Sequence, residues 1–470
     1  MKKILRLALA LIFGVGFVAS AWPAQAENID DFVRASMRQQ RIPGLALAVM
    51  REGKIIKAQG YGLANVELNV PVSPATIFQS GSMGKQFTAT GVMMLVEEGK
   101  VNLDDKITKY FEGAPPGWNA ITVRHLLTHT SGIKDYTGED FEYRKDFTEE
   151  ELLKKVESFP PDFAPGDKWS YSNSGYLLLG ILIHKATGKF YGDFLQERIF
   201  RPLGMETTRI ISEADIIPNR AAGYRLVKGE LKNQEWVSPS LNTTADGALY
   251  FTVLDLAKWD AALYTEALLK RSSFDRMWTA VKLNEGKTYP YGFGWFLGDI
   301  RGHRIVEHGG AWQGFTTGIS RYVDDKLTIV TLTNLDSGHA RPDEIIHGVA
   351  GLYDQALAPL PLPKPIVDKE PEVTALFRGL LKGPVTGGVD AAAFTEEARK
   401  QWFPDRIKEL KETLEDQGPV KSVDLLERSE KEGVRTYRYR LIFDNGRVVS
   451  FALSMTKENK IAGLKRESER

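Results

Sequence analysis

The chain has 470 residues, of which 43% are hydrophobic and 26% are charged, and its formal net charge at pH 7 is zero. These proportions are typical of a soluble globular protein, and the length predicts roughly two to four domains. Beyond the first 26 residues, 58 basic side chains stand against 61 acidic ones. That balance gives no reason to expect nucleic acid or an anionic membrane as a partner.

The first 26 residues have the pattern of a secretory signal peptide. Lys2, Lys3 and Arg6 form a charged start, residues 7–20 are apolar, and residues 24–26 (Ala-Gln-Ala) fit a small-residue cleavage site. The apolar stretch is shorter than the roughly 18 residues that a membrane span needs. We therefore expect export to the periplasm or the medium, with no stable membrane insertion after cleavage. The chain has no cysteine, which excludes disulfides and lipid-acylated thiols.

Residues 27–358 predict one domain in which helices and strands do not alternate regularly. Apolar periodicity predicts helices over residues 29–41, 82–98, 176–187, 254–269 and 344–357. Short β-branched and aromatic runs predict strands over residues 45–50, 54–59, 293–296, 304–307, 317–322 and 327–332. The order of these elements favours the α+β class.

A proline-rich segment then separates a smaller region. Five prolines fall between residues 359 and 371 and indicate a stiff linker. Residues 372–470 predict a small α+β domain with helices first, over residues 373–381, 391–403 and 405–416. Two alternating runs around residues 444–446 (Asp-Asn-Gly) then predict a hairpin with strands over residues 434–443 and 447–455.

Ser82-Met83-Gly84-Lys85 is the first motif that carries chemistry. Ser-x-x-Lys occurs at Ser82, Ser131 and Ser454, and a chain of this length contains it about twice by accident. Only Ser82 opens an apolar helix. At helical spacing Lys85 reaches the Ser82 hydroxyl, and the helix N-terminus favours a developing oxyanion. The alternative is that Ser82 only caps the helix and Lys85 is a solvated lysine.

Tyr171-Ser172-Asn173 is the second motif. It follows a Pro-Gly-Asp turn and precedes a helix, so we expect it on a loop. A tyrosine near a cation can act as a base, and an asparagine amide can both donate to and accept from an amide substrate. The alternative is a turn in which Asn173 caps the next helix.

His308-Gly309-Gly310 is the third motif, and strand-like sequence flanks it. Glycines within a strand mark a close backbone approach, such as that of a substrate that adds to the edge and meets one oxyanion-hole N–H. The alternative is a glycine bulge with a surface histidine. With its usual pKa of about 6.5, His308 predicts an activity limb near neutral pH. His125 and His129 lack the glutamate and third ligand of a zinc site, and we expect no metal.

Taken together, these motifs resemble those of the serine β-lactamases of class C and the related DD-peptidases, D-aminopeptidases and esterases. Further segments support the resemblance: residues 78–88 (FQSGSMGKQFT), 121–132 (ITVRHLLTHTSG), 163–166 (FAPG) and 171–176 (YSNSGY). The resemblance covers roughly residues 28–357. It implies a β-lactamase/transpeptidase-like fold, in which a five-stranded antiparallel sheet flanked by helices lies beside a helical subdomain with the active site between them. The C-terminal region resembles, more loosely, the nuclear-transport-factor-like α+β fold.

The resemblance also implies roles for the motif residues. Ser82 is similar to the acylated nucleophile of the family, and Lys85 and Tyr171 to the pair that shares general-base and general-acid work. Asn173 resembles the residue that orients the substrate amide, and His308 to Gly310 the substrate-binding strand. The backbone N–H groups of Ser82 and Ala311 would then form the oxyanion hole. No cofactor is implied.

The third motif differs from the β-lactamase pattern, because the chain contains no Lys-Thr-Gly. A lysine there offers a permanent cation to a substrate carboxylate, and His-Gly-Gly resembles the peptidase and D-aminopeptidase branches instead. The sequence therefore predicts an exported serine hydrolase that acts on a small amide or ester, such as a D-amino-acid peptide. The alternatives are a β-lactamase, or a binding protein of the same fold that forms an adduct without turnover.

Overall fold

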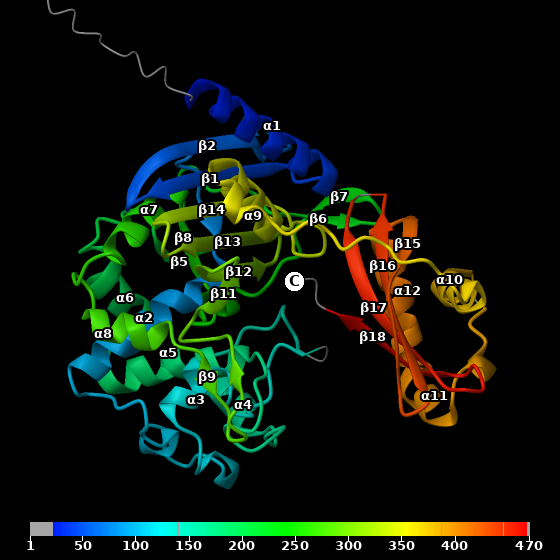
Figure 1. The fold of residues 1–470 in the computed structure, drawn as a ribbon. Helices are drawn as coiled ribbons and strands as arrows, with labels where there is room; N and C mark the ends of the chain where they lie inside the picture. The colour runs from blue at the N-terminus through cyan, green and yellow to red at the C-terminus, as the bar shows by residue number, and fades with distance from the viewer. Residues whose placement is uncertain (1–21, 139–140, 387, 445, 468–470) are drawn as a thin grey trace, which may run out of the picture.

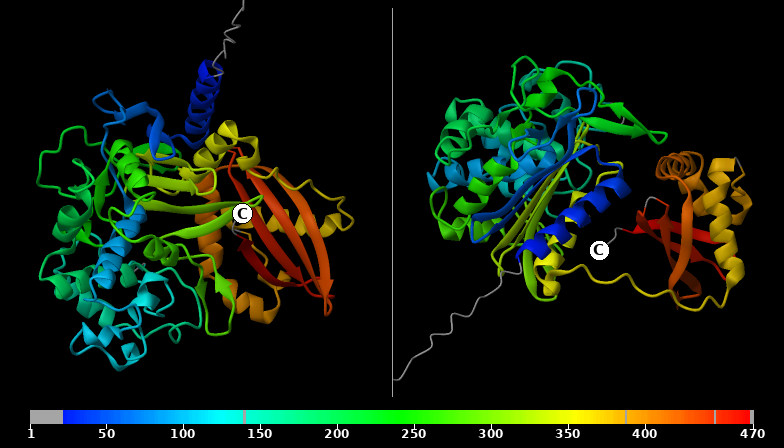
Figure 2. Two further views of the ribbon diagram at one scale, coloured as in Figure 1. Left: turned by 60° about the vertical axis from the view of Figure 1, so that its left-hand side comes forward. Right: turned by 90° about the horizontal axis from the view of Figure 1, so that it is seen from above.

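The computed structural model describes residues 22–138, 141–386, 388–444 and 446–467. Two domains lie side by side and are joined by an extended segment (Figures 1 and 2). Each domain has its own antiparallel sheet and its own apolar core. The predicted signal peptide falls mostly on residues 1–21, outside the described residues.

The sheet of the first domain has seven strands in the order β11-β12-β13-β14-β1-β2-β3. Their bounds are β1 (Gly44–Arg51), β2 (Lys54–Asn65), β3 (Val70–Pro71), β11 (Phe296–Ile300), β12 (His303–Trp312), β13 (Phe315–Tyr322) and β14 (Leu327–Thr333). The resemblance implies five strands, and the two extra ones are the short edge strands β3 and β11. The turn between β1 and β2 is at Glu52 and Gly53, as predicted, and both have positive φ, which matches the twist of a tight hairpin.

The sheet is covered on both faces because its central strands carry apolar residues on both sides. In β1, Leu45, Leu47 and Val49 pack with α1 (Trp22–Gln40) and α9 (Pro342–Tyr353). The alternate residues of β1 face the larger core, which contains the helical half of the domain. This period of two is that of a strand buried on both faces. Figure 1 shows α1 and α9 on one side of the sheet and α2 and α5 on the other.

The helical half lies against one face of this sheet. Its helices are α2 (Lys85–Glu97), α3 (Val123–Leu127), α4 (Glu149–Glu157), α5 (Asn173–Thr187), α6 (Tyr191–Leu195), α7 (Val253–Ala262) and α8 (Arg271–Met277). Short strands connect them: β4 (Phe78–Gln79), β5 (Arg209–Ile210), β6 (Tyr224–Val227), β7 (Glu230–Asn233), β8 (Leu249–Phe251), β9 (Val281–Lys282) and β10 (Thr288–Tyr289). Gly188 ends α5 in the left-handed conformation, with φ 71°, as the sequence predicts.

The extents of several predicted elements of this domain are wrong, and two of them have a clear local cause. The helix predicted over residues 254–269 ends at Ala262, where the Thr265 hydroxyl donates to the Ala262 carbonyl and competes with the next helical bond. The strand predicted over residues 293–296 begins only at Phe296, because Gly294 has φ 76° and turns the chain out of the extended conformation.

The second domain packs three helices against a four-stranded antiparallel sheet in the order β15-β16-β17-β18. Its elements are α10 (Pro371–Thr386), α11 (Glu396–Trp402), α12 (Asp405–Gln417), β15 (Val420–Lys431), β16 (Val434–Phe443), β17 (Val448–Met455) and β18 (Ile461–Glu467). The predicted hairpin is β16–β17. The sequence missed β15 and β18, whose many charged residues obscure the alternation.

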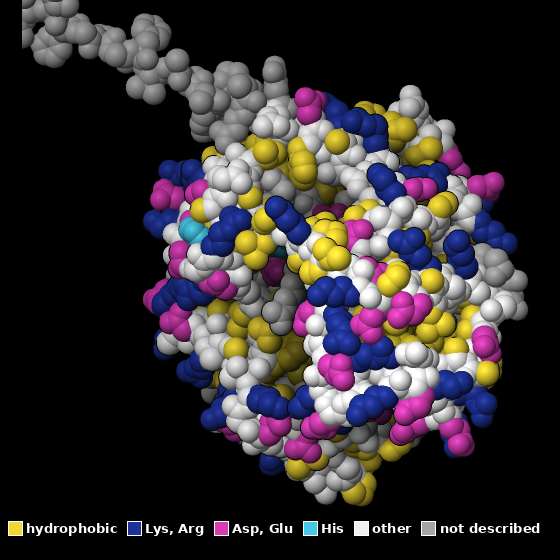
Figure 3. All heavy atoms as spheres, turned by 45° about the vertical axis from the view of Figure 1, so that its right-hand side comes forward, with side chains coloured by type: hydrophobic (Ala, Val, Ile, Leu, Met, Phe, Trp, Pro, Cys, Tyr) yellow, Lys and Arg dark blue, Asp and Glu magenta, His cyan; other side chains and the backbone are white. Residues whose placement is uncertain are grey.

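The surface of the molecule mixes charges of both signs. Over the face shown in Figure 3, Lys and Arg side chains are interspersed with Asp and Glu, in keeping with the zero formal charge. Within the part of the chain that the structure describes, each helix is too short or too polar to cross a membrane.

Candidate active site

The three sequence motifs meet at one place in the first domain. Ser82 lies in a 3₁₀ turn (Gly81–Gly84) that leads into α2, Tyr171 precedes α5, Asn173 begins α5, and residues 308–311 lie on β12. Ser82 lines two adjoining cavities of about 340 and 440 Å³. The first also contains Asn173 and Ala311, and the second Tyr171 and residues 308–311. All eight predicted site residues therefore lie in or directly beneath one cleft.

Lys85 is buried below Ser82 and its ammonium group has three oxygen partners. Lys85 Nζ donates to Ser82 Oγ at 3.0 Å, to Asn173 Oδ1 at 2.8 Å and to the carbonyl of Asp246 at 2.6 Å. The side chain has 0% relative exposure. The alternative of a solvated lysine is therefore wrong, because the amine is buried and its three donors are satisfied by protein oxygens. Lys85 thus fixes the serine hydroxyl and the asparagine amide to each other.

Tyr171 lies beside this amine. The Lys85 Nζ atom is 4.9 Å from the centroid of the Tyr171 ring, within the range of a cation–π contact. The backbone N–H of Asn173 donates to Asp135 Oδ2 at 2.5 Å, and Asn173 Nδ2 donates to Thr137 Oγ1 at 3.3 Å. These bonds position the start of α5 and present the phenol, the amine and the amide on one side of Ser82.

Glycines allow β12 and a second loop to approach the backbone around Ser82 closely. A Cβ atom at Gly310 would lie 2.0 Å from the Ser80 carbonyl, one at Gly81 would lie 2.4 Å from Ala311 N, and one at Gly247 would lie 2.6 Å from Gly81 C. Real Cβ atoms do not approach backbone atoms so closely, so these three positions require glycine. The close approach brings the backbone of Ser82 next to that of Ala311, as an oxyanion hole needs.

His308 belongs to a chain of hydrogen bonds that the sequence did not reveal. Ser172 N donates to His129 Nδ1, so the proton of neutral His129 is on Nε2 and points to Tyr291 Oη at 3.1 Å. Tyr291 Oη lies 3.1 Å from His308 Nε2, and His308 Nδ1 lies 2.6 Å from the carbonyl of Gly309. The only consistent assignment has Tyr291 donating to His308 Nε2 and His308 Nδ1 donating to Gly309.

This chain contradicts the prediction that His308 titrates near neutral pH. Burial lowers the pKa of His308 to about 3, and the charge of Lys85 acts in the same direction. Burial, Lys85 and His308 also hold the pKa of His129 well below its usual value. Burial raises the pKa of the Tyr291 phenol. All three groups are therefore neutral at physiological pH, and His308 is a fixed part of β12 rather than a proton carrier.

The sequence did not predict that the Asp246 carbonyl accepts from Lys85. It also did not predict the hydrogen bonds that link His129, Tyr291 and His308. Tyr291 starts a run of glycines and aromatic residues (residues 291–296, YGFGWF), a composition typical of a tightly packed bend and the only local signal for it. The Asp246 carbonyl has no sequence signal, because any residue supplies one. Among the described residues no group of three or more His, Asp or Glu side chains is arranged to hold a metal.

Comparisons with known proteins agree with this geometry. The model of the Beta-lactamase family matches residues 29–352. Penicillin-binding protein 4* of Bacillus subtilis (strain 168) is 33% identical over 299 residues, which are 60% of this chain and 66% of that protein. The D-aminopeptidase of Gluconobacter oxydans (strain 621H) is 26% identical over 303 residues, 62% of this chain and 56% of that protein. The chain thus matches less than two thirds of the length of these relatives.

Solved structures are also similar. The octameric penicillin-binding protein homologue from Pyrococcus abyssi has a TM-score of 0.63 and 25% identity, and the match covers 94% of this chain and 98% of that one. The D-amino acid amidase from Ochrobactrum anthropi SV3 has a TM-score of 0.60 and 26% identity, over 70% of this chain and 97% of that one. The first match is long enough to include most of the second domain, whereas the second corresponds in extent to the first domain.

Proposed function

The chain belongs to the beta-lactamase family of serine hydrolases, and on that premise we propose that it hydrolyses a small amide or ester through an acyl-enzyme on Ser82. A D-amino-acid peptide or amide is the substrate class we favour. The similar D-aminopeptidase and D-amino acid amidase support this choice. The observation that carries the proposal is the buried Lys85 amine 3.0 Å from the Ser82 hydroxyl, at the floor of an open cleft.

The reaction has two halves. Ser82 Oγ attacks the substrate carbonyl carbon and its proton passes to whichever of Lys85 and Tyr171 is unprotonated at that moment, while the carbonyl oxygen becomes an anion facing the N–H groups of Ser82 and Ala311. The tetrahedral species collapses, the bond to the leaving nitrogen or oxygen breaks, and that atom takes up the proton. Water then attacks the ester on Ser82 in the same way, which releases the acid and restores the hydroxyl.

The charge distribution of the cleft supports a substrate without a free carboxylate near β12. His308 is neutral, since burial lowers its pKa to about 3, and it occupies the place where the β-lactamase motif has a permanent cation. Asp246 and Asp336 line the smaller of the two cavities beside Ser82, of about 340 Å³. Carboxylates in the cavity lining attract an amine and repel a second carboxylate. These features favour amides and amino-acid derivatives over penicillins.

β-Lactam hydrolysis is the second candidate, and the family match itself favours it. A panel of chromogenic D- and L-amino-acid anilides, simple esters and a cephalosporin, given to the full chain, separates the two. We expect turnover of an ester and a D-amino-acid anilide, with slower turnover of the lactam. Faster turnover of the lactam than of every amide would reverse the order of the candidates.

Ser82→Ala tests the nucleophile, and Ser454→Ala is its matched control, because Ser454 begins another Ser-x-x-Lys in the second domain. We expect Ser82→Ala to lose ester turnover and Ser454→Ala to keep it. Mass spectrometry after exposure to a fluorophosphonate should show the added mass at Ser82 alone. Persistent acylation of Ser82 without turnover of any substrate would instead favour a binding protein.

We propose that the enzyme is exported, on the strength of the charged and apolar pattern of residues 1–26. N-terminal sequencing of the protein recovered from the periplasm or the medium should begin at Glu27. Recovery of the uncleaved chain in the cytoplasm would contradict export.

A further inference from the structure

The second domain contacts the first beside the catalytic cleft. Arg447, in the turn between β16 and β17, donates from Nη1 to the carbonyl of Gly338 at 3.2 Å. Gly338 belongs to the segment between β14 and α9, and residues 336–338 of that segment line the cavity that holds Ser82. One hydrogen bond therefore connects the second domain directly to a wall of the cleft.

The described residues on either side of Arg447 make backbone hydrogen bonds with each other and with Pro419. Phe443 N donates to the Arg447 carbonyl at 2.8 Å, Gly446 N donates to the Phe443 carbonyl at 2.9 Å, and Asp444 N donates to the Pro419 carbonyl at 3.0 Å. Gly446 has φ 79° and lies against α1, since a Cβ atom there would be 1.6 Å from Nε2 of Gln39. The turn thus contacts both α1 and the segment that follows β14.

Charge complementarity supports the same contact. Glu344, in the first turn of α9, accepts from Arg341 Nε at 2.6 Å. Burial raises the pKa of Glu344, and the nearby charges of Arg341 and Arg447 oppose that rise. Arg447 therefore lies near the Glu344 carboxylate as well as the Gly338 carbonyl, and the opposite charge of Glu344 attracts it.

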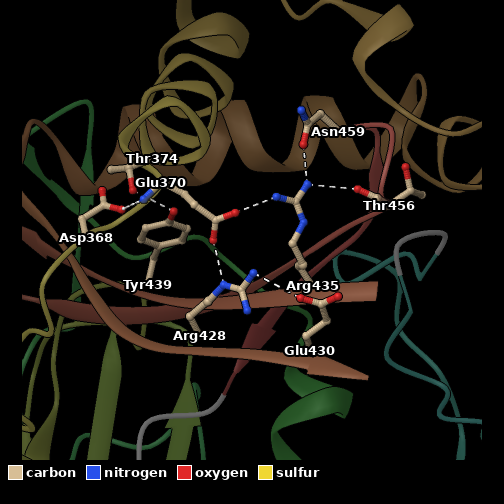
Figure 4. Close-up of polar contacts among 9 residues, drawn as sticks. All are labelled: Asp368, Glu370, Thr374, Arg428, Glu430, Arg435, Tyr439, Thr456 and Asn459. Carbon is tan, nitrogen blue, oxygen red and sulfur yellow. Dashed lines mark hydrogen bonds and ion pairs between the residues drawn. The ribbon is translucent and has the colours of Figure 1, made fainter. Parts of the chain in front are cut away.

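The second half of the linker is hydrogen-bonded to the sheet of the second domain. Arg440 Nη1 donates to the Pro363 carbonyl and Ile366 N donates to the Leu425 carbonyl, both at 2.8 Å. Near the end of the linker, Glu370 accepts from Arg428 Nε and Arg435 Nη1, both at 2.7 Å. Figure 4 shows this carboxylate between the two guanidinium groups, with Asp368 and the Thr374–Tyr439 pair beside it.

From these contacts we propose that the second domain is a specificity element of the cleft, in which Arg447 holds residues 336–338 in the position that longer substrates contact. The inference rests on the proposed hydrolase function. A short ester reaches only Ser82 and the β12 edge, so it is insensitive to this wall. A substrate that extends past Trp312 toward residues 336–338 loses ordered contacts when the wall is free to move. Arg447 acts through the segment and is a positioning residue.

The kinetic test compares Arg447→Ala with Arg399→Ala in the full chain, because Arg399 is an exposed arginine of α11 in the same domain. The substrates are para-nitrophenyl acetate and a para-nitroanilide of a tripeptide. We expect Arg447→Ala to lower the long-to-short ratio of kcat/KM by at least about threefold, the effect of losing one hydrogen bond to a charged group at an open site. Arg399→Ala should leave the ratio unchanged.

A second measurement reports the mobility of residues 336–338. The chain has no cysteine, so Ser337→Cys gives a single attachment site for a fluorophore on the exposed part of the segment. We expect lower fluorescence anisotropy of the label when Arg447→Ala is added than when Arg399→Ala is added. Equal anisotropy with Arg447→Ala and with Arg399→Ala would contradict the proposed role of the second domain but not the proposed hydrolase function. An unchanged ratio of kcat/KM in an active Arg447→Ala enzyme would have the same meaning. Failure of the wild-type chain to turn over either substrate would overturn the proposed function as well.

Discussion

The surroundings of Ser82 and the sheet of the second domain use charged side chains in opposite ways. In the first domain Lys85, Arg321 and Asp260 are buried and each is bonded to specific partners. On the second sheet Arg438 pairs with Glu427 and Glu467, but about half of the arginine side chain is exposed. A buried charge is costly unless its partners are complete, whereas an exposed pair contributes little. The buried Asp260–Arg321 pair is therefore sensitive to a single polar change that the exposed pairs of Arg438 tolerate.

The largest expected difference concerns the two kinds of ion pair. Asp260→Ala leaves Arg321, with 1% exposure, as a buried charge without its carboxylate, and we expect the free energy of unfolding to fall by about 3–5 kcal/mol. Arg438→Ala removes exposed pairs and should cost less than about 1 kcal/mol. Urea unfolding of both variants measures this contrast, and equal losses would show that burial does not separate the two regions.

The next effect is on catalysis. Lys85→Ala removes the donor to Ser82, Asn173 and the Asp246 carbonyl, and we expect kcat/KM for an ester to fall by at least about 10²-fold, as for a general acid–base group. Lys100→Ala, at an exposed ion pair with Glu98 just beyond α2, is the matched control and should be near wild type. Near wild-type kcat/KM in Lys85→Ala would remove Lys85 from the mechanism.

The pH dependence of stability should come from the buried histidines. The pKa of His308 is lowered to about 3 in the folded chain, so the unfolded state binds the proton first as the pH falls below about 6.5. From pH 6.5 to pH 5 proton uptake by His308 in the unfolded state should therefore lower the free energy of unfolding by about 2 kcal/mol. Urea unfolding at both pH values measures the change, and His308→Asn should reduce it. A stability independent of pH in this window would contradict the assignment.

His347 gives the contrast within the same domain. Burial lowers the pKa of His347, but the hydrogen bond and charge of Glu307 raise it above its usual value. Its contribution to stability is complete below about pH 6.5 and is lost as the pH rises through the raised value, the reverse of the His308 case. The contribution of His308 is therefore lost on the acid side of about pH 6.5, and that of His347 on the alkaline side.

The smallest predicted effect tests the hydrogen-bond chain behind β12. Tyr291→Phe keeps the ring and removes the hydroxyl between His129 and His308, and we expect kcat to fall about tenfold with KM nearly unchanged, because the strand loses orientation and not its binding contacts. Tyr191→Phe, which removes another buried hydroxyl that donates to the Thr244 carbonyl, is the control. Equal changes of kcat in Tyr291→Phe and Tyr191→Phe would show that the Tyr291 hydroxyl has only a structural role.

The sequence predicted those features of the site that depend on residues close together in the chain. The spacing of Ser82 and Lys85 gave their contact, and the glycines after His308 indicated a close backbone approach. It did not predict the third partner of Lys85, because Asp246 is 161 residues away and only the tertiary fold brings its carbonyl there. For the same reason the neutral state of His308 was missed: its usual pKa assumes solvent, and the burial that lowers the pKa comes from Tyr291 and neighbouring strands.

The three glycines that let backbones meet around Ser82 have a practical meaning for laboratory evolution of this enzyme. In a saturation library that includes Gly81, Gly247 or Gly310, most variants would not form the active site, because any other side chain adds a Cβ atom. At each position that atom would lie within 2.6 Å of a backbone atom. Diversity is better placed at side chains that border the opening without touching those backbones, such as Thr137, Tyr143 and Leu241.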